Sequence, residues 1–169
     1  MKVRQEQPRD YPEIYELIKN AFATAPNADG DEQDYTNKLR ESERYIPELA
    51  LVAEKEGCLV GHVMFTATPV KYGENTYWAL LLSPLCVELS YRNTGIGALL
   101  VEEGLKRAKE MGYSAVFVVG DPKYYRRFGF ACASEFDITN EGDIPEQFVM
   151  ALELEPGALT GKKGTIRVV

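Results

Sequence analysis

The sequence has few residues that bind metals and no long apolar run. Among 169 residues there are three cysteines, none in a CxxC pair, and one histidine. So few soft ligands make a zinc site unexpected, and unpaired cysteines fit a reducing, cytoplasmic compartment. The most apolar stretch, WALLLSPLCVEL, has 12 residues and contains a proline, whereas a bilayer-spanning helix needs about 20. The amino terminus, MKVRQEQPRD, has no apolar signal core. We therefore expect no metal and no membrane partner.

Positive charge is also scarce. The chain has 19 lysines and arginines against 26 aspartates and glutamates, a net charge of −7. A nucleic-acid partner would require a clustered basic surface, so we expect none. An acidic surface attracts cationic amines, but the same charge also serves solubility, and both interpretations stay open.

Three segments have the periodicity of helices. Residues 10–22 place apolar side chains on one helical face, with Asp10 and Glu13 spaced as a capping box. Residues 25–34 have the composition of a loop, and residues 35–42 favour a second helix. Residues 95–111 predict a longer helix with outward pairs Glu102–Lys106 and Glu103–Arg107. Its expected inward residues are Ile96, Leu99, Leu100, Ala108 and Met111.

Strands are predicted between and after these helices. Residues 48–57 and 58–70 form two strands joined by a tight turn at Glu56-Gly57, and the continuous apolar run in residues 76–89 predicts a strand buried on both faces. A single α/β (α+β) domain with a mixed sheet over residues 1–169 follows from this order. Its remaining predicted elements are a first strand near Val3, a strand at 114–121, a short helix at 122–130 ending at Gly129, a strand at 147–154 and a last strand in the tail.

Two glycines stand where the 95–111 helix begins, in YRNTGIGALL. A helix start leaves backbone N–H groups without partners and carries partial positive charge, so bare glycine backbone there can hold a phosphate. A tight turn with close helix packing explains the same glycines. The sequence does not fit a Walker loop, because no lysine follows, or a dinucleotide fingerprint, because the position of its third glycine is Leu100.

Two motifs in order give the chain a family resemblance. SPLCVELSYRNTGIGALLVEEGLKRAKEMGY resembles the coenzyme A-binding core of the GNAT superfamily of N-acetyltransferases, whose (Q/R)-x-x-G-x-(G/A) signature is matched by Arg92, Gly95 and Gly97. VVGDPKYYRRFGF resembles the second signature, an aromatic-Tyr pair before G-F. The resemblance covers nearly the whole chain and is greatest to the YhbS-like branch.

The resemblance implies a fold and an activity. The fold is a mixed, mostly antiparallel sheet of about six or seven strands flanked by about four helices, splayed between the fourth and fifth strands. The activity is transfer of acetyl from acetyl-CoA to a primary amine of a small molecule or peptide, by direct attack in a ternary complex. A catalytically inactive acyl-CoA sensor is the alternative. Paired domains are common in the superfamily, and the sequence does not name the acceptor.

The resemblance also implies residues for the cofactor. Arg92 and the backbone amides of residues 93–98 would hold the pyrophosphate, and the strand before the loop would lie along the pantetheine arm, with the Val87 amide polarising the thioester carbonyl. Cys86 is not expected to form an acyl intermediate, because no basic partner accompanies it. The expected cofactor residues are Leu85, Cys86, Val87, Arg92, Asn93, Thr94, Gly95, Ile96, Gly97, Ala98 and Tyr125.

Proton transfer requires two further groups. The family's acid corresponds to Tyr125, with Tyr124 as the alternative, because a protonated phenol can give a proton to the departing sulfur. The base that frees the amine is left open, since the strand before the loop has no carboxylate. Glu54, Glu88 and Asp121 are candidates, each with a surface role as its alternative. His62 fits either an acceptor pocket or a hydrogen-bonded structural position.

Overall fold

The structure is a computed structural model that describes residues 1–25 and 28–168. Its backbone contacts divide into two compact units. Unit 1 comprises Met1–Thr66 and Ser83–Arg107, and unit 2 comprises Ala67–Leu82 and the chain from Ala108 onward. Strands β3 (Cys58–Tyr72) and β4 (Asn75–Val87) contribute residues to both units.

Unit 1 contains antiparallel strands in the order β1-β2-β3. Strand β1 (Lys2–Gln5) pairs with β2 (Tyr45–Lys55), and β2 pairs with β3 from Lys55 opposite Cys58 to Tyr45 opposite Thr66. Glu56 and Gly57, with φ of 53° and 81°, close the β2–β3 hairpin. Both central residues have the positive φ of a two-residue hairpin turn, which confirms the predicted turn.

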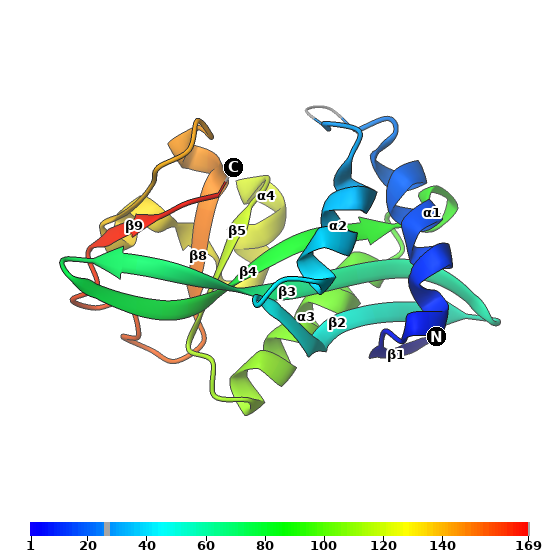
Figure 1. Ribbon diagram of the computed structural model, residues 1–169, viewed down its shortest axis with the longest axis horizontal. Helices are drawn as coiled ribbons and strands as arrows, with labels where there is room; N and C mark the ends of the chain where they lie inside the picture. The colour runs from blue at the N-terminus through cyan, green and yellow to red at the C-terminus, as the bar shows by residue number, and fades with distance from the viewer. Residues whose placement is uncertain (26–27, 169) are drawn as a thin grey trace. The chain divides into compact units, whose positions relative to one another are not determined.

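The helices of unit 1 lie against the two faces of these strands. On one side (Figure 1), α1 (Tyr11–Phe22) packs Ile14 and Ile18 into a cluster with Val52, and α2 (Glu32–Arg40) packs its Leu39 against Met64. On the other face lies α3 (Ile96–Glu110), which approaches β3 very closely. A Cβ built at Gly104 would lie 2.2 Å from Cε1 of Phe65, so a glycine is required for this packing.

Unit 2 pairs β4 with β5 in parallel, from Leu80 opposite Val116 to Leu82 opposite Val118, and continues antiparallel from β5 to β8 and from β8 to β6. Strand β9 pairs antiparallel with β3 and parallel with β7. A cluster around the fully buried Phe117 forms its core. The elements are β5 (Ala115–Val119), α4 (Pro122–Tyr125), β6 (Ala131–Cys132), β7 (Ile138–Asn140), β8 (Val149–Glu153) and β9 (Gly164–Ile166).

Short 3-10 helices connect several of these elements. They are η1 (Pro8–Asp10), η2 (Leu89–Tyr91), η3 (Arg126–Phe128), η4 (Ala133–Phe136) and η5 (Glu146–Phe148). The short helix ends as predicted at Gly129, which has φ of 98°. Within the described ranges no helix is both long and apolar enough to cross a membrane. The same residues contain no group of three His, Cys, Asp or Glu side chains arranged to hold a metal ion.

The mixed α/β fold is confirmed, with four α-helices among the described residues, but some local predictions were wrong. The predicted Asp10–Glu13 capping box does not form. Asp10 instead accepts from Arg4 at 2.7 Å and, in a capping box at η1, from the Gln7 amide at 2.8 Å, and Glu13 accepts from the Leu59 amide at 2.7 Å. Leu99 and Met111, expected inward, are each 41% exposed.

Boundaries and strand number also differ from the expectation. Helix α2 begins at Glu32, within the segment predicted as a loop, and residues 26–27 of that segment lie outside the described residues. The described chain has nine strands instead of six or seven. The additional strands include β6 and β7, which are two and three residues long, too short to produce an alternating pattern.

Candidate functional site

The loop between β4 and α3 is held by its own hydrogen bonds. The Glu88 carboxylate accepts from the Ser90 amide at 2.9 Å, and the Glu88 carbonyl accepts from the Tyr91 amide at 2.9 Å. The Thr94 hydroxyl donates to the Tyr91 carbonyl. These local contacts make a compact turn in unit 1 that leads into the first turn of α3.

Gly95 is needed here for its backbone angle. Its φ is +90°, whereas a Cβ at this position would meet nothing within 4 Å. Glycine adopts such an angle without the steric cost that a side chain brings. The first helical bond of α3 runs from the Leu99 amide to the Gly95 carbonyl at 3.0 Å. The amides of residues 96–98 precede that bond, so they have no acceptor within the helix.

The turn is partly open to solvent. Residues 92–95 are exposed, Gly97 and Ala98 are half-buried, and Ile96 is buried. Amides without helical acceptors at the positive end of a 15-residue helix form a setting that favours an anion. The local geometry of residues 92–98 therefore has the features that an anion cradle requires.

Arg92 forms a hydrogen bond with a backbone carbonyl, whereas two other arginines of unit 1 pair with carboxylates. Its Nη2 donates to the Ala21 carbonyl, in the last turn of α1, at 2.7 Å. Arg4 and Arg40 instead pair with the carboxylates of Asp10 and Glu6, at 2.7 and 2.8 Å. Among the ion pairs of residues 1–25 and 28–168, none involves Arg92. A carbonyl orients the guanidinium without neutralising it, so its positive charge remains available to an anion.

The end of β4 precedes this turn in unit 1. The Ser83–Pro84 peptide bond is cis, and the Glu88 amide donates to the Val60 carbonyl on β3 at 2.8 Å. Cys86 is 5% exposed and packs into the α1 cluster. Burial raises the pKa of the Cys86 thiol to about 12, so this cysteine is protonated at neutral pH and is a poor nucleophile. Its neighbours Leu85 and Val87 are half-buried.

Tyr125 lies in unit 2, on α4, and is 9% exposed. Its ring lies against Gly120, where a Cβ would come within 2.3 Å of Cε2. Tyr124 meets the same ring edge to face at 5.0 Å, and Phe130 does so at 5.7 Å. Burial, with a smaller contribution from Tyr124, raises the pKa of Tyr125 above that of an ordinary phenol. The hydroxyl therefore carries its proton at neutral pH.

The three carboxylates considered as bases all have structural partners. Glu54 is 3.5 Å from Nη2 of Arg4. Glu88 caps η2 through the Ser90 amide, and Asp121 caps α4 by accepting from the Lys123 amide at 2.9 Å. Each of these contacts gives the carboxylate a structural role.

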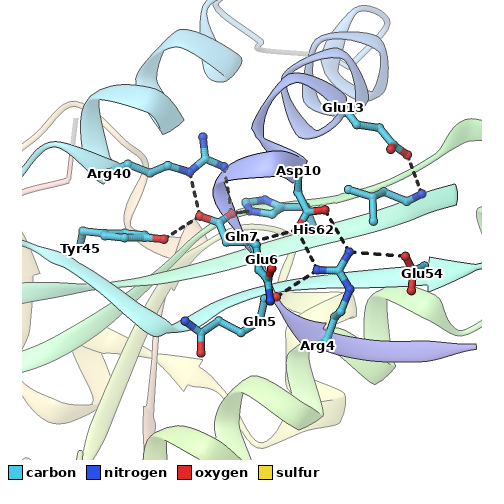
Figure 2. Close-up of polar contacts among 11 residues, drawn as sticks. Arg4, Gln5, Glu6, Gln7, Asp10, Glu13, Arg40, Tyr45, Glu54 and His62 are labelled. Carbon is cyan, nitrogen blue, oxygen red and sulfur yellow. Dashed lines mark hydrogen bonds and ion pairs between the residues drawn. The ribbon is translucent and has the colours of Figure 1, made fainter. Parts of the chain in front are cut away.

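Sequence reasoning missed a buried polar cluster around Glu6. Figure 2 shows the Glu6 carboxylate between Arg40, Tyr45 and His62, which come from α2, β2 and β3. It accepts from Nε and Nη2 of Arg40 at 2.8 and 2.9 Å, from the Tyr45 hydroxyl at 2.8 Å and from Nε2 of His62 at 2.8 Å. The only sequence signal for this cluster was a histidine on an otherwise apolar strand.

The cluster has a defined charge state. Burial alone would raise the pKa of Glu6, but hydrogen bonds from Arg40 and His62 outweigh burial and lower it to about 2. Glu6 is therefore an anion at neutral pH, balanced by the cation Arg40. Of the two predictions for His62, the hydrogen-bonded position is confirmed by its contact with Glu6, while Nδ1 of the same ring is buried without a partner among the described atoms.

The structure thus brings part of the predicted site together. Unit 1 holds the loop residues 92–98 and the strand end 85–87, and unit 2 holds Tyr125. The loop has the exposure and the backbone geometry expected of an anion cradle. Tyr125 has the protonation state expected of an acid.

A family model and two curated relatives all describe proteins similar to this chain as acetyltransferases. A family model described as an acetyltransferase (GNAT) domain matches residues 2–133. The N-acetyltransferase YhbS of Escherichia coli K12 is 35% identical over 167 residues, covering 98% of this chain and 95% of that protein. The N-acetyltransferase YjhQ of the same strain is 33% identical over 158 residues, covering 90% and 84%.

Solved structures agree with these relatives. The crystal structure of Escherichia coli YhbS in complex with CoA has a TM-score of 0.86 and 31% identity, covering 99% of this chain and 89% of that one. A GNAT acetyltransferase from Brucella melitensis in complex with acetyl-CoA has a TM-score of 0.75 and 28% identity, covering 92% and 88%. From the family match and this degree of identity, the chain belongs to the GNAT family of acetyltransferases.

Proposed function

We propose that this acetyltransferase binds acetyl-CoA on the loop at the start of α3 and transfers the acetyl group to a primary amine of a small molecule or peptide. The observation that carries the proposal is the partly exposed turn at residues 92–98, with unbonded amides at a helix start and the side chain of Arg92, which has no carboxylate partner, at its beginning. Such amides favour a diphosphate. The relatives solved with CoA and acetyl-CoA support the same ligand.

Each residue has a separate task in this proposal. The amides of residues 93–98 and Arg92 bind the pyrophosphate, and residues 85–87 contact the pantetheine arm through their backbone. The Val87 amide donates to the thioester oxygen as negative charge develops there. The Cys86 side chain takes no part, because it is buried in the α1 cluster and keeps its proton.

Tyr125 supplies the proton for the departing thiolate. The amine nitrogen bonds to the acetyl carbon and loses a proton to solvent, the carbon–sulfur bond breaks, and the sulfur takes the phenolic proton, which solvent then restores. The raised pKa of Tyr125 keeps the phenol protonated at neutral pH, although a phenol is a weaker acid than a thiol, whose pKa is about 8.5. Its first contribution is therefore a hydrogen bond to the sulfur. Its hydrogen bond to the sulfur stabilises the leaving group before the proton moves.

A matched glycine pair tests the cradle. Gly95 and Gly112 have φ of 90° and 94°, and a Cβ at either position meets nothing within 4 Å. Gly95→Leu and Gly112→Leu should therefore lose similar stability, but only Gly95→Leu should lose CoA affinity, by tenfold or more in calorimetric titration. Gly97→Val gives a second test inside the helix if Gly95→Leu fails to fold. Equal CoA affinity in all variants would exclude the cradle.

Turnover separates the enzyme from the acyl-CoA sensor. Release of CoA thiol is measured with acetyl-CoA and four amines: spermidine, tyramine, kanamycin and a lysine peptide. Tyr125→Phe should lower kcat about 10²-fold, within the range for a positioned acid, while Tyr124→Phe should not. Loss only in Tyr124→Phe would transfer the role to that residue. CoA binding without turnover of any amine would support the sensor.

A further inference from the structure

Nδ1 of His62 is a buried polar atom to which the proposed function assigns no role. His62 has no exposed surface, its Nε2 lies 2.8 Å from Oε1 of Glu6, and its Nδ1 has no partner among the described atoms. A buried polar atom of this kind is costly and rare in native proteins. We therefore looked for a group that could form a hydrogen bond with Nδ1 of His62.

The surroundings determine which nitrogen carries the proton. Glu6 is ionised and can only accept, and it already receives hydrogen bonds from Arg40 and Tyr45. Nε2 of His62 must therefore be the donor in the contact with Glu6. Nδ1 is then left with a lone pair, which is the state of a base. A neutral ring also keeps the cluster without net charge, since Arg40 balances Glu6.

The charged and titratable groups of this neighbourhood come from five segments. They are Glu6 after β1, Tyr11 on α1, Arg40 on α2, Tyr45 on β2 and Cys86 on β4. The Arg40 guanidinium lies 4.0 Å from the centre of the Tyr11 ring. Burial raises the pKa of both Tyr45 and Cys86, so both stay neutral. None of these five groups offers a base with a free lone pair.

His62 is also adjacent to the strand end where the proposed function places the thioester. A Cβ at Gly61, next to His62, would lie 3.4 Å from the Cys86 carbonyl oxygen, and the Val60 carbonyl accepts from the Glu88 amide at 2.8 Å. These contacts keep β3 beside residues 85–87 of β4 within unit 1. The three carboxylates first considered as bases each have a structural partner.

We propose that Nδ1 of His62 accepts, through one water molecule, the proton that the acceptor amine must lose, and that Glu6 is the positioning residue that orients the ring. The inference rests on the proposed function. The amine enters as an ammonium ion and gives one proton through the water to Nδ1, and its freed lone pair then attacks the acetyl carbon. The nitrogen gives its second proton to solvent as the amide forms. The imidazolium returns this proton to solvent after the carbon–sulfur bond has broken and Tyr125 has protonated the sulfur.

Because His62 is the only histidine, its ring can be observed without assignment. Protein labelled with ¹⁵N-histidine should show, at pH 7, one ring with protonated Nε2 and bare Nδ1. In Glu6→Gln the Nδ1–H form should appear, because the carboxylate no longer selects the tautomer. A ring protonated at Nδ1 in the wild-type protein at pH 7 would overturn the inference. This measurement needs no turnover, so it stays informative even if the proposed function fails.

Kinetics supply the second test, with whichever of the four amines turns over fastest. His62→Gln preserves a donor to Glu6 but has no basic nitrogen, so kcat should fall about 10²-fold, with KM for acetyl-CoA unchanged. Tyr45→Phe removes another donor to Glu6 and leaves the His62–Glu6 pair intact. It should lower stability and leave kcat unchanged. An unchanged kcat in His62→Gln would overturn the inference.

Discussion

Replacing Glu6 with glutamine should make the stability of the protein less dependent on acid pH. The carboxylate has a pKa of about 2 in the folded protein against an ordinary 4.5. This difference corresponds to about 3 kcal/mol of stability at neutral pH, at 1.36 kcal/mol per pKa unit. Because the folded pKa is the lower one, the contribution is complete above the unfolded pKa and is lost as the pH falls toward 2. The side-chain amide of glutamine would also place an N–H group against the donors that now surround the Glu6 carboxylate, which are Arg40, Tyr45 and His62.

The assay is urea unfolding of the wild-type protein and Glu6→Gln at several pH values. At neutral pH the variant should be less stable by about 3 kcal/mol, as expected when one partner of a buried ion pair is removed. Between pH 5 and pH 3 the difference should shrink by about 2 kcal/mol. The comparison stays below pH 5 because histidines change charge between about pH 5 and 8. A difference that is constant from pH 5 to pH 3 would refute the charge state assigned to Glu6.

Two further predictions concern packing and thiol chemistry. In urea unfolding, Gly104→Ala should lower the free energy of unfolding by about 1–3 kcal/mol, as overpacked cores do, because its Cβ would lie 2.2 Å from Phe65. Phe65→Leu should lower the free energy of unfolding less in the Gly104→Ala background than alone. Full additivity of the two substitutions would contradict the contact. A disulfide reagent at pH 8 should label exposed Cys58 first and half-buried Cys132 next. It should label Cys86 only in urea, because that thiol is buried and has a pKa of about 12. Labelling of all three thiols at one rate would disprove this order.

Local patterns and motifs were enough to predict the framework of the fold. The α1 face, the Glu56-Gly57 turn and the end of the short helix at Gly129 each follow from a few neighbouring residues, and the structure confirms them. The Glu103–Arg107 pair on α3 is also present, at 3.0 Å. These features depend on the spacing of residues within one element, and that spacing can be seen directly in a single sequence.

Features that depend on distant residues were not predictable in the same way. Asp10 resembles a helix cap in sequence, but Arg4 on the neighbouring strand takes its carboxylate. The Glu6 cluster joins side chains 34, 39 and 56 residues apart, and no periodicity relates them. For the candidate site, the loop could be located from its glycines. The free nitrogen of His62 required knowledge of what packs around it.

The hydrogen bond between Arg92 and the Ala21 carbonyl has a thermodynamic consequence for ligand binding. It joins residues 71 apart in sequence and selects one rotamer of a side chain whose conformational freedom is worth about 2 kcal/mol. If the turn binds an anion as proposed, the guanidinium is already held in place, and ordering that side chain adds little to the free energy that binding must overcome. A lysine at position 92 would carry the same charge on a freely rotating chain, and affinity would fall although the electrostatic attraction stayed the same.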